Sequence, residues 1–233
     1  MILLLSILLA NPVIAEVDGL FHYGANYEQE RQALAILERT APNAPADYEV
    51  LWRLTRSYYT VGAGGPASER VKYFERGIEV GKRAVEQNPD GVEGHYWLAA
   101  SWGVFLQEKG GLTAFRNVGR VRSELEAVVR LNDTYEEASA YTALGQIDRQ
   151  LPGMFGGDLK RGIARLEHGL KVAPENAELK LALAEAYLDA KRKEEALREL
   201  REVVHLDLHS PRAYVERQAQ QKAQTLLSKL ERK

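Results

Sequence analysis

The chain of 233 residues contains no cysteine. This absence excludes disulfides, thiolate nucleophiles and metal sites built on cysteine. It also leads us to expect no bacterial lipoprotein anchor, because that anchor needs a cysteine at the cleavage site. A chain without cysteine is compatible with any cellular compartment.

The chain also lacks a strong net charge. Its formal charge is −2 at pH 7, although 27% of its residues are charged. No global field therefore attracts nucleic acid or an anionic membrane, and binding to either would have to come from a local patch. We expect no nucleic-acid partner.

Long hydrophobic runs are absent apart from one near the N-terminus. Residues 2–9 are almost unbroken apolar residues, which is too short a run to span a bilayer. Asn11 and Pro12 end it, and Val13-Ile14-Ala15 resembles a small-residue cleavage site. We expect a signal peptide over residues 1–15, and a periplasmic or secreted mature chain over 16–233 without a transmembrane segment. The alternative is a buried first helix, because no Lys or Arg precedes the apolar run.

The rest of the chain shows helical repeats, and the clearest unit spans residues 177–208. A large, a small and an aromatic residue share one helical face, a polar turn follows at 189–193, and small and apolar residues then recur. These positions are Leu183, Ala184, Tyr187, Ala196, Leu200 and Val203. Small residues let two antiparallel helices approach closely, so the unit predicts a packed helix pair.

The same pattern predicts three earlier units, at residues 47–89, 92–133 and 138–174. Their first helices carry Leu54-Thr55-Tyr58, Leu98-Ala99-Trp102 and Leu144-Gly145. An unpaired helix is expected over 27–40 and a capping helix over 212–231. Prolines lie between the units, where a helix ends and the next begins, and no window shows the alternation typical of strands.

These positions resemble the tetratricopeptide-repeat (TPR) pattern. The resemblance implies an all-α fold, a TPR-type right-handed superhelix of antiparallel helix pairs, with about four repeats, an N-terminal helix and a C-terminal capping helix. The whole mature chain is then one domain.

A narrower resemblance covers residues 47–206. It rests on motifs in a fixed order, which are Leu51-Trp52-Arg53-Leu54, residues 94–99, Leu125-Glu126, Ala143-Leu144-Gly145, and Leu151-Pro152-Gly153 with Gly156-Gly157-Asp158. The stretch resembles the T component of TRAP transporters and, more distantly, the regulator of microtubule dynamics family. The first resemblance implies a periplasmic helical protein that partners a solute-binding protein.

Aromatic and basic residues gather in adjacent first helices of the repeats, which line the concave surface in this fold. They predict an amphipathic groove that anchors a peptide or a small ligand. The candidate groove residues are Arg53, Arg56, Tyr59, His95, Tyr96, Trp97 and Arg149. The alternative is that these side chains pack against the neighbouring repeat.

Three segments that contain glycine predict long connections within repeats, at residues 61–66, 109–117 and 151–157. Such loops should project from one edge of the superhelix and are candidate contact sites. The candidate loop contacts are Gly64, Gly65, Pro152, Gly153 and Phe155.

No motif predicts catalysis, a cofactor or a metal. The glycines at residues 62–65 follow a helical segment, and no lysine stands where a phosphate-binding loop needs one. His205 and His209 share a helical face, but no third ligand lies nearby in the sequence. We therefore expect a protein that is not an enzyme.

The function that the sequence favours is that of a scaffold binding a protein partner through its groove and glycine-rich loops. One alternative is an accessory subunit of a TRAP-type uptake system that contacts a solute-binding protein or the solute. The other is a structural module that assembles with itself as a homo-oligomer.

Overall fold

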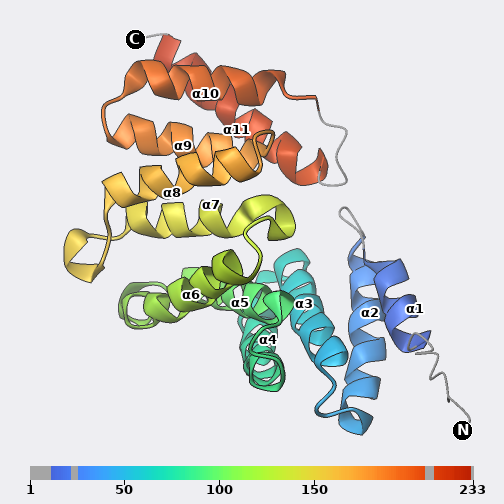
Figure 1. Cartoon of the computed structure of the whole chain (residues 1–233). Helices are drawn as coiled ribbons and strands as arrows, with labels where there is room; N and C mark the ends of the chain where they lie inside the picture. Colours follow the sequence, from blue (N-terminus) through green and yellow to red (C-terminus); the bar gives the residue numbers. More distant parts are fainter. Residues whose placement is uncertain (1–11, 22–25, 208–212, 232–233) are drawn as a thin grey trace, which may run out of the picture.

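The protein folds into antiparallel helix pairs that stack along one superhelix (Figure 1). A computed structural model describes residues 12–21, 26–207 and 213–231. These residues form eleven α-helices and two short 3-10 helices, and no strand is found among them. The prediction of an all-α repeat superhelix is confirmed.

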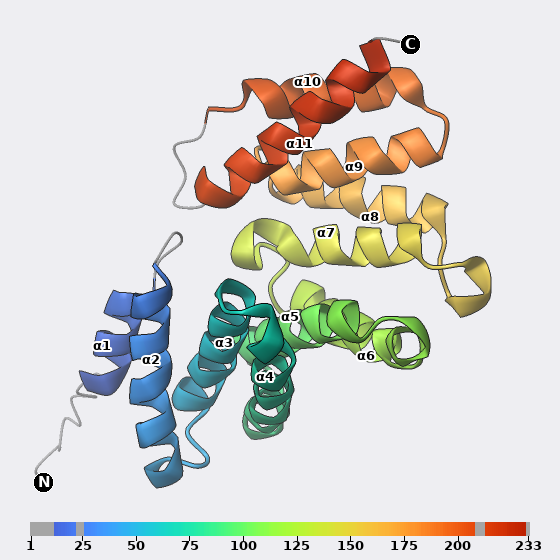
Figure 2. The same cartoon turned by 180° about the vertical axis from the view of Figure 1, so that it is seen from behind.

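Four antiparallel pairs form the body of the superhelix. They are α3 (Tyr48–Gly64) with α4 (Ala67–Gln87), α5 (Val92–Lys109) with α6 (Gly111–Leu131), α7 (Tyr135–Gln150) with α8 (Leu159–Val172), and α9 (Ala177–Asp189) with α10 (Lys193–His205). Each pair packs on the next, as Figure 2 shows from behind. The last helix, α11 (Ala213–Glu231), packs against α9 and α10 and covers the end of the stack.

Close helix approach depends on the small residues of the repeats. A Cβ atom built on Gly145 would lie 2.4 Å from Cγ of Leu166, so only glycine lets α8 approach α7 this closely. Side chains cap several helices: Asp47 accepts hydrogen bonds at the start of α3, Asp158 at the start of α8 and Asn176 at the start of α9.

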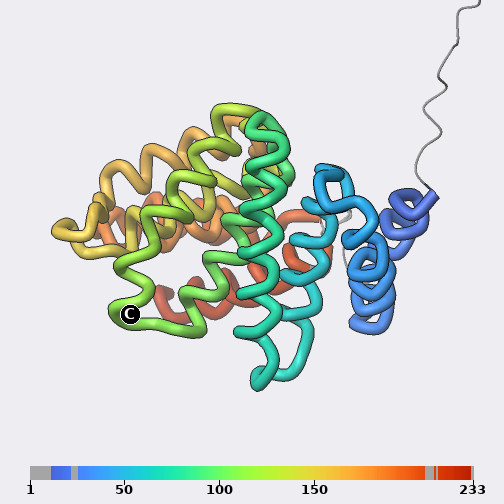
Figure 3. Tube along the Cα trace, turned by 90° about the horizontal axis from the view of Figure 1, so that it is seen from below, coloured from blue at the N-terminus to red at the C-terminus, as the bar shows by residue number. Residues whose placement is uncertain are grey.

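The N-terminal helices correct one expectation. The sequence predicts an unpaired helix over 27–40, but α2 (Tyr27–Thr40) packs against α1 (Pro12–Leu20), with η1 (Ala41–Asn43) leading to α3. Val17 of α1 is fully buried in the same apolar cluster as Leu34 and Leu37. Helix α1 is therefore the partner of α2, and the two helices pack because each buries an apolar face against the other. The repeat pattern did not reveal this pairing. Figure 3 shows the pair at one end of the superhelix, beside α3.

The expected signal peptide falls partly outside the described residues, because residues 1–11 are not described. Ala15, where we expect cleavage, lies inside α1. Cleavage stays a prediction. Within the described ranges, no helix combines the length and apolar character needed to cross a membrane.

Two of the three predicted long connections are wrong. Helix α3 continues through Gly62 to Gly64, and only Gly65 and Pro66 separate it from α4. The reason is close packing: a Cβ atom on Gly62 would lie 2.6 Å from the Phe74 ring of α4. Between α5 and α6, Gly110 alone makes the turn, at φ +60°. The third segment does form a long connection, from Leu151 to Asp158, with η2 (Gly153–Phe155) inside it.

Candidate functional site

Two arginines of α3 meet a carboxylate of α1. Arg53 donates from Nε to Oδ1 of Asp18 at 2.8 Å and from Nη2 to Oδ2 at 2.6 Å. Arg56 donates from Nη2 to Oδ1 of the same carboxylate at 3.3 Å. A guanidinium that binds both oxygens of a carboxylate fixes the orientation of its partner as well as its charge.

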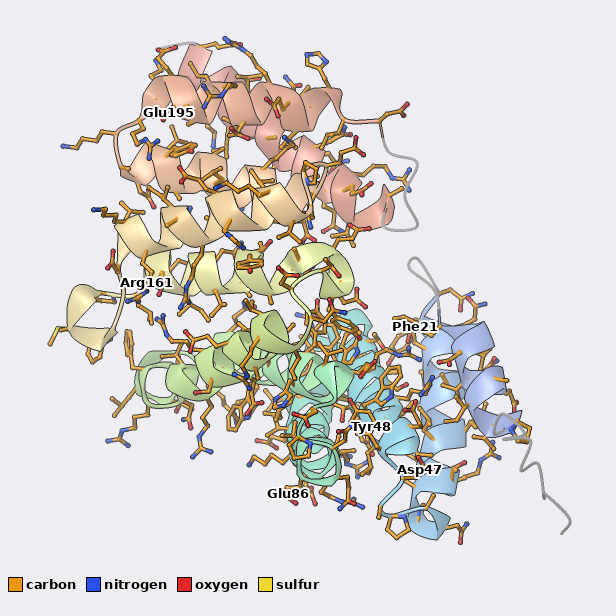
Figure 4. The ribbon with its side chains drawn as sticks, in the orientation of Figure 1. Phe21, Asp47, Tyr48, Glu86, Arg161 and Glu195 are labelled. Atoms are coloured by element: carbon orange, nitrogen blue, oxygen red, sulfur yellow. The ribbon has the colours of Figure 1, made fainter. Side chains whose placement is uncertain are left out.

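An aromatic residue just beyond α1 completes this contact. The Arg56 guanidinium lies 3.6 Å from the ring centroid of Phe21, and Phe21 meets the ring of Trp97 edge-on, with centroids 6.3 Å apart. Tyr59 and Tyr96 surround Trp97, with centroids 5.5 and 5.1 Å away. Figure 4 labels Phe21 where α1 and α2 face the helices that follow. Phe21 therefore lies on a surface built by α3 and α5.

A tyrosine of α7 extends the aromatic cluster into the third repeat. The ring centroid of Tyr135 lies 5.2 Å from that of Tyr96. Burial, together with the nearby carboxylate of Glu93, raises the pKa of Tyr135 to about 12, against the partial effect of Trp97 and the two arginines. The phenol is therefore neutral and able to donate a hydrogen bond at any physiological pH. We call Arg53, Arg56, Tyr59, Tyr96, Trp97 and Tyr135 the arginine–aromatic surface.

Two carboxylates balance the charge at this surface: Asp18 of α1, and Glu49 of α3, which pairs with Arg53 at 2.6 Å. Burial alone would raise the pKa of Asp18, but Arg53 and Arg56 outweigh it and hold that pKa below its ordinary value. Burial lowers the pKa of Arg56, and Asp18 offsets only part of that effect. Arg56 is 5% exposed, and its Nε has no hydrogen-bond partner within the described part of the chain. A buried guanidinium of this kind needs an anion beside it, and α1 provides one.

The structure brings together five of the seven predicted groove residues, which are Arg53, Arg56, Tyr59, Tyr96 and Trp97. They are not an open groove, since Arg53, Arg56 and Trp97 are all less than a tenth exposed. These side chains pack against a neighbouring segment, since Asp18 and Phe21 of the N-terminal segment contact Arg53, Arg56 and Trp97. Their role in binding stays a prediction.

The other two predicted groove residues lie elsewhere. Nδ1 of His95 lies 2.5 Å from Oε2 of Glu124, and its Nε2 lies 2.9 Å from the Pro89 carbonyl oxygen, so it links α5 to α6. Arg149 donates to Glu185 at 2.9 Å and links α7 to α9.

The predicted loop contacts separate into two groups. Gly64 and Gly65 pack against Tyr27 of α2, since a Cβ atom on Gly65 would lie 2.9 Å from the tyrosine oxygen. The sequence predicts a projecting loop here, but Gly64 is the last residue of α3 and Gly65 follows it directly. Pro152, Gly153 and Phe155 are exposed in the connection between α7 and α8.

Sequence reasoning missed Asp18, Phe21 and Tyr135 at this site. Residues 16–26 match no repeat position, so the sequence pattern assigned them no element. The available signal was a carboxylate followed three residues later by an aromatic, which places the two on one face of a helical turn.

A second, smaller feature lies between α7, α9 and α11. A cavity of about 190 Å³ is lined by polar residues such as Gln146, Glu178 and Lys222 and by apolar ones such as Leu181 and Val215. Lys222 binds Glu185 at 2.6 Å, so charges in the cavity compensate one another. Within the described ranges no group of three metal-ligating side chains occurs, and His209 lies outside those ranges.

Comparison with protein families separates the two halves of the chain. The model of "Regulator of microtubule dynamics protein 1-3" matches residues 13–147, more than half of the chain. The chain belongs to the regulator of microtubule dynamics protein 1-3 family. The family match includes α1 except its first residue and the whole of the arginine–aromatic surface. A tetratricopeptide-repeat model matches residues 156–219.

Solved structures share the fold of this family member. A thermophilic TPR protein of Thermus thermophilus, TTC0263, is 22% identical with a TM-score of 0.63, covering 92% of this chain and 98% of that one. MamA from Desulfovibrio magneticus RS-1 is 20% identical with a TM-score of 0.55, covering 76% and 85%. At these identities the likeness shows the fold alone. No curated protein matches, and the resemblance to the TRAP T component is not confirmed.

Proposed function

We propose that this protein is a scaffold that binds a partner protein at the arginine–aromatic surface, in the place where the N-terminal segment lies. The partner would present a helical segment with a carboxylate and, three residues later, an aromatic ring. The observation that carries the proposal is the contact of Asp18 and Phe21 with Arg53, Arg56 and Trp97.

The bound groups define what this surface recognises. The bidentate pair between Arg53 and Asp18 selects a planar carboxylate. Arg56 and Trp97 offer a cationic face and an aromatic edge to one ring. A partner segment that carries both groups would replace the contacts of α1 without leaving a buried charge unpaired.

The N-terminal segment is suited to exchange because α1 is short, and most of its apolar contacts, those of Val13, Ile14 and Leu20, are only partly buried. Helix α1 has nine residues and one fully buried side chain, Val17. Helices this short are marginal in water, so α1 depends on its docked contacts. Because α1 is tethered, it competes at an effective concentration in the millimolar range. Weakening its contacts should therefore increase the apparent affinity for a partner.

A labelled peptide of residues 12–26 tests this proposal on the full chain. Fluorescence anisotropy should show that the Asp18→Asn, Phe21→Ala double variant binds the peptide about tenfold or more tightly than the original chain. The matched control is Glu16→Gln, an exposed α1 residue, which should change nothing. A peptide carrying the same two substitutions should not bind. Equal affinity for the double variant and the original chain contradicts the proposal, provided that circular dichroism shows equal helicity.

We extend the proposal to the location of the protein in the cell and to the class of its partner. The apolar run over residues 2–9 supports export and a periplasmic location. Cleavage after Ala15 would remove residues 12–15 of α1 but would keep Asp18 and Phe21 in the mature chain. Fractionation with mass measurement of the N-terminus tests this. A pull-down from a periplasmic extract then distinguishes the expected partners. Recovery of a solute-binding protein supports the TRAP-type role, and recovery of this chain alone supports self-assembly.

A further inference from the structure

The exposed large hydrophobic residues gather at one edge of the superhelix. Across the described ranges they are Leu112, Phe115, Met154 and Phe155, with exposed fractions of 61, 38, 86 and 44%. The first two lie in the first turns of α6, and the other two lie in η2. The rings of Phe115 and Phe155 stack with centroids 4.6 Å apart. We call these four residues the apolar edge.

The apolar edge projects from the superhelix. In Figure 1 and Figure 3 the η2 connection and the start of α6 extend to the same side, opposite α1 and α2. A contiguous apolar surface of this kind marks an interaction site on a protein that is otherwise well packed.

Basic side chains outnumber acidic ones beside the apolar edge, where Asp158 is the acidic residue that directly follows the η2 connection. Residues 110–123 contain three arginines and no acidic residue, and residues 151–157 contain no charged residue at all. Within the described structure, Arg116 and Lys160 are exposed and have no carboxylate within ion-pair distance, and the Arg120 guanidinium lies 5.7 Å from the centroid of the Trp102 ring. The protein as a whole carries a charge of −2, so this edge is a local exception.

Buried ion pairs hold the η2 connection in place beneath the edge. Asp148 is enclosed by Arg122, Arg161 and Arg165. Arg122 and Arg161 also donate to the carbonyl oxygen of Gly156, at 3.1 and 2.6 Å. The connection is therefore preorganised, and little conformational entropy is lost when Met154 and Phe155 bind a surface.

We propose that the apolar edge docks on the surface of an anionic lipid bilayer. Met154, Phe155, Leu112 and Phe115 would enter the headgroup region, and Arg116, Arg120 and Lys160 would meet lipid phosphates and carboxylates. A projecting apolar tip with a cationic rim fits a broad negative surface. A second copy fits poorly, because two such edges face to face would bring their unpaired cations together.

Co-sedimentation of the full chain with vesicles tests the proposal. Phosphatidylcholine vesicles containing phosphatidylserine should bind the protein at low salt, whereas phosphatidylcholine alone should not. Binding should weaken at high salt, because salt screens exposed charges. The Met154→Ser, Phe155→Ser variant should lose about tenfold or more in affinity, since insertion scales with buried apolar area.

Variants that remove one positive charge each measure the electrostatic contribution to vesicle binding. Arg116→Gln and Lys160→Gln should each weaken binding about fivefold. The matched control, Lys72→Gln with Lys171→Gln, removes two exposed cations elsewhere and should have no effect. Phe21→Ala should also have no effect, which keeps this test independent of the partner site.

Three results would overturn the proposal. The first is an absence of binding to anionic vesicles at low salt. The second is unchanged binding by both the apolar and the charge variants. The third is binding of an acidic polypeptide, such as polyglutamate, through these residues without vesicle binding, which would assign the edge to a protein partner.

Discussion

The guanidinium of Arg53 binds both carboxylate oxygens of Asp18, which lies 35 residues earlier in the chain. This pair attaches the N-terminal helix to the first full repeat and closes the arginine–aromatic surface. Arg53 is 8% exposed and the Asp18 side chain is 41% exposed, so water reaches the pair only from the side of the carboxylate.

The first prediction concerns the coupling of these two residues. A double-mutant cycle of Asp18→Asn and Arg53→Gln should give a coupling free energy of about 1–2 kcal/mol, near the lower end for hydrogen bonds to charged groups because the Asp18 side chain is 41% exposed. Urea denaturation of the four chains measures it. A coupling indistinguishable from zero would mean that α1 is not docked in solution.

The second prediction concerns the enclosed carboxylate of Asp148. Asp148→Asn should lower the free energy of unfolding by about 3–5 kcal/mol, because Arg122 and Arg165 lose their buried counter-charge. Asp90→Asn, at an exposed position, is the control and should have little effect. A loss under about 1 kcal/mol in urea denaturation would contradict this assignment.

Asp148 also predicts a dependence of stability on acid. Burial would raise its pKa, but hydrogen bonds from Arg161 and Arg122 outweigh burial and lower the pKa beneath the ordinary value of 3.8. A depressed folded-state pKa stabilises the fold above the unfolded value, and this stabilisation is lost as pH falls through the folded value. The difference between the original chain and Asp148→Asn should therefore shrink below pH 3.8.

The third prediction concerns His95, which links α5 to α6. The hydrogen bond with Glu124 is the largest effect on its pKa and raises it above 6.5, with burial opposing. The stabilisation is therefore full below pH 6.5 and declines as pH rises through the folded-state pKa. Relative to His95→Gln, the original chain should lose stability as pH rises above 6.5. A difference that stays constant or grows with pH would refute the assignment.

The fourth prediction compares two helical glycines. Gly145→Ala should destabilise the protein by about 1–3 kcal/mol, because the new methyl group would meet Leu166 at 2.4 Å. Gly103→Ala, in α5, meets no atom within 4 Å and should stabilise by up to about 1 kcal/mol. Thermal melting of the two variants in parallel measures both. Equal shifts would contradict the packing that we describe for α7 and α8.

The sequence by itself determined the repeat architecture, because that information is local. Leu183, Ala184 and Tyr187 lie within one helical turn of each other, so their periodicity alone indicates a packed face. Prolines between units and glycines in the connection over 151–157 mark boundaries by the same local chemistry.

Glycine was the local signal that misled. Gly62 and the glycines at the third connection look alike in one dimension, because the residue serves both tight turns and close helix packing. Only the position of the Phe74 ring against Gly62 decides between these roles. The segment around Gly62, which the sequence predicts as a loop, is therefore the end of helix α3.

The contacts of the two surfaces were also decided by tertiary structure. Asp18 reaches Arg53 across 35 residues, and Phe115 stacks on Phe155 from the next repeat. Neither pair can be recognised from a periodic pattern in the sequence, because each depends on how whole helices are placed relative to one another. Sequence pattern thus identified arginines and aromatics as candidates, whereas chain folding determined which of them α1 covers and which remain exposed at the edge.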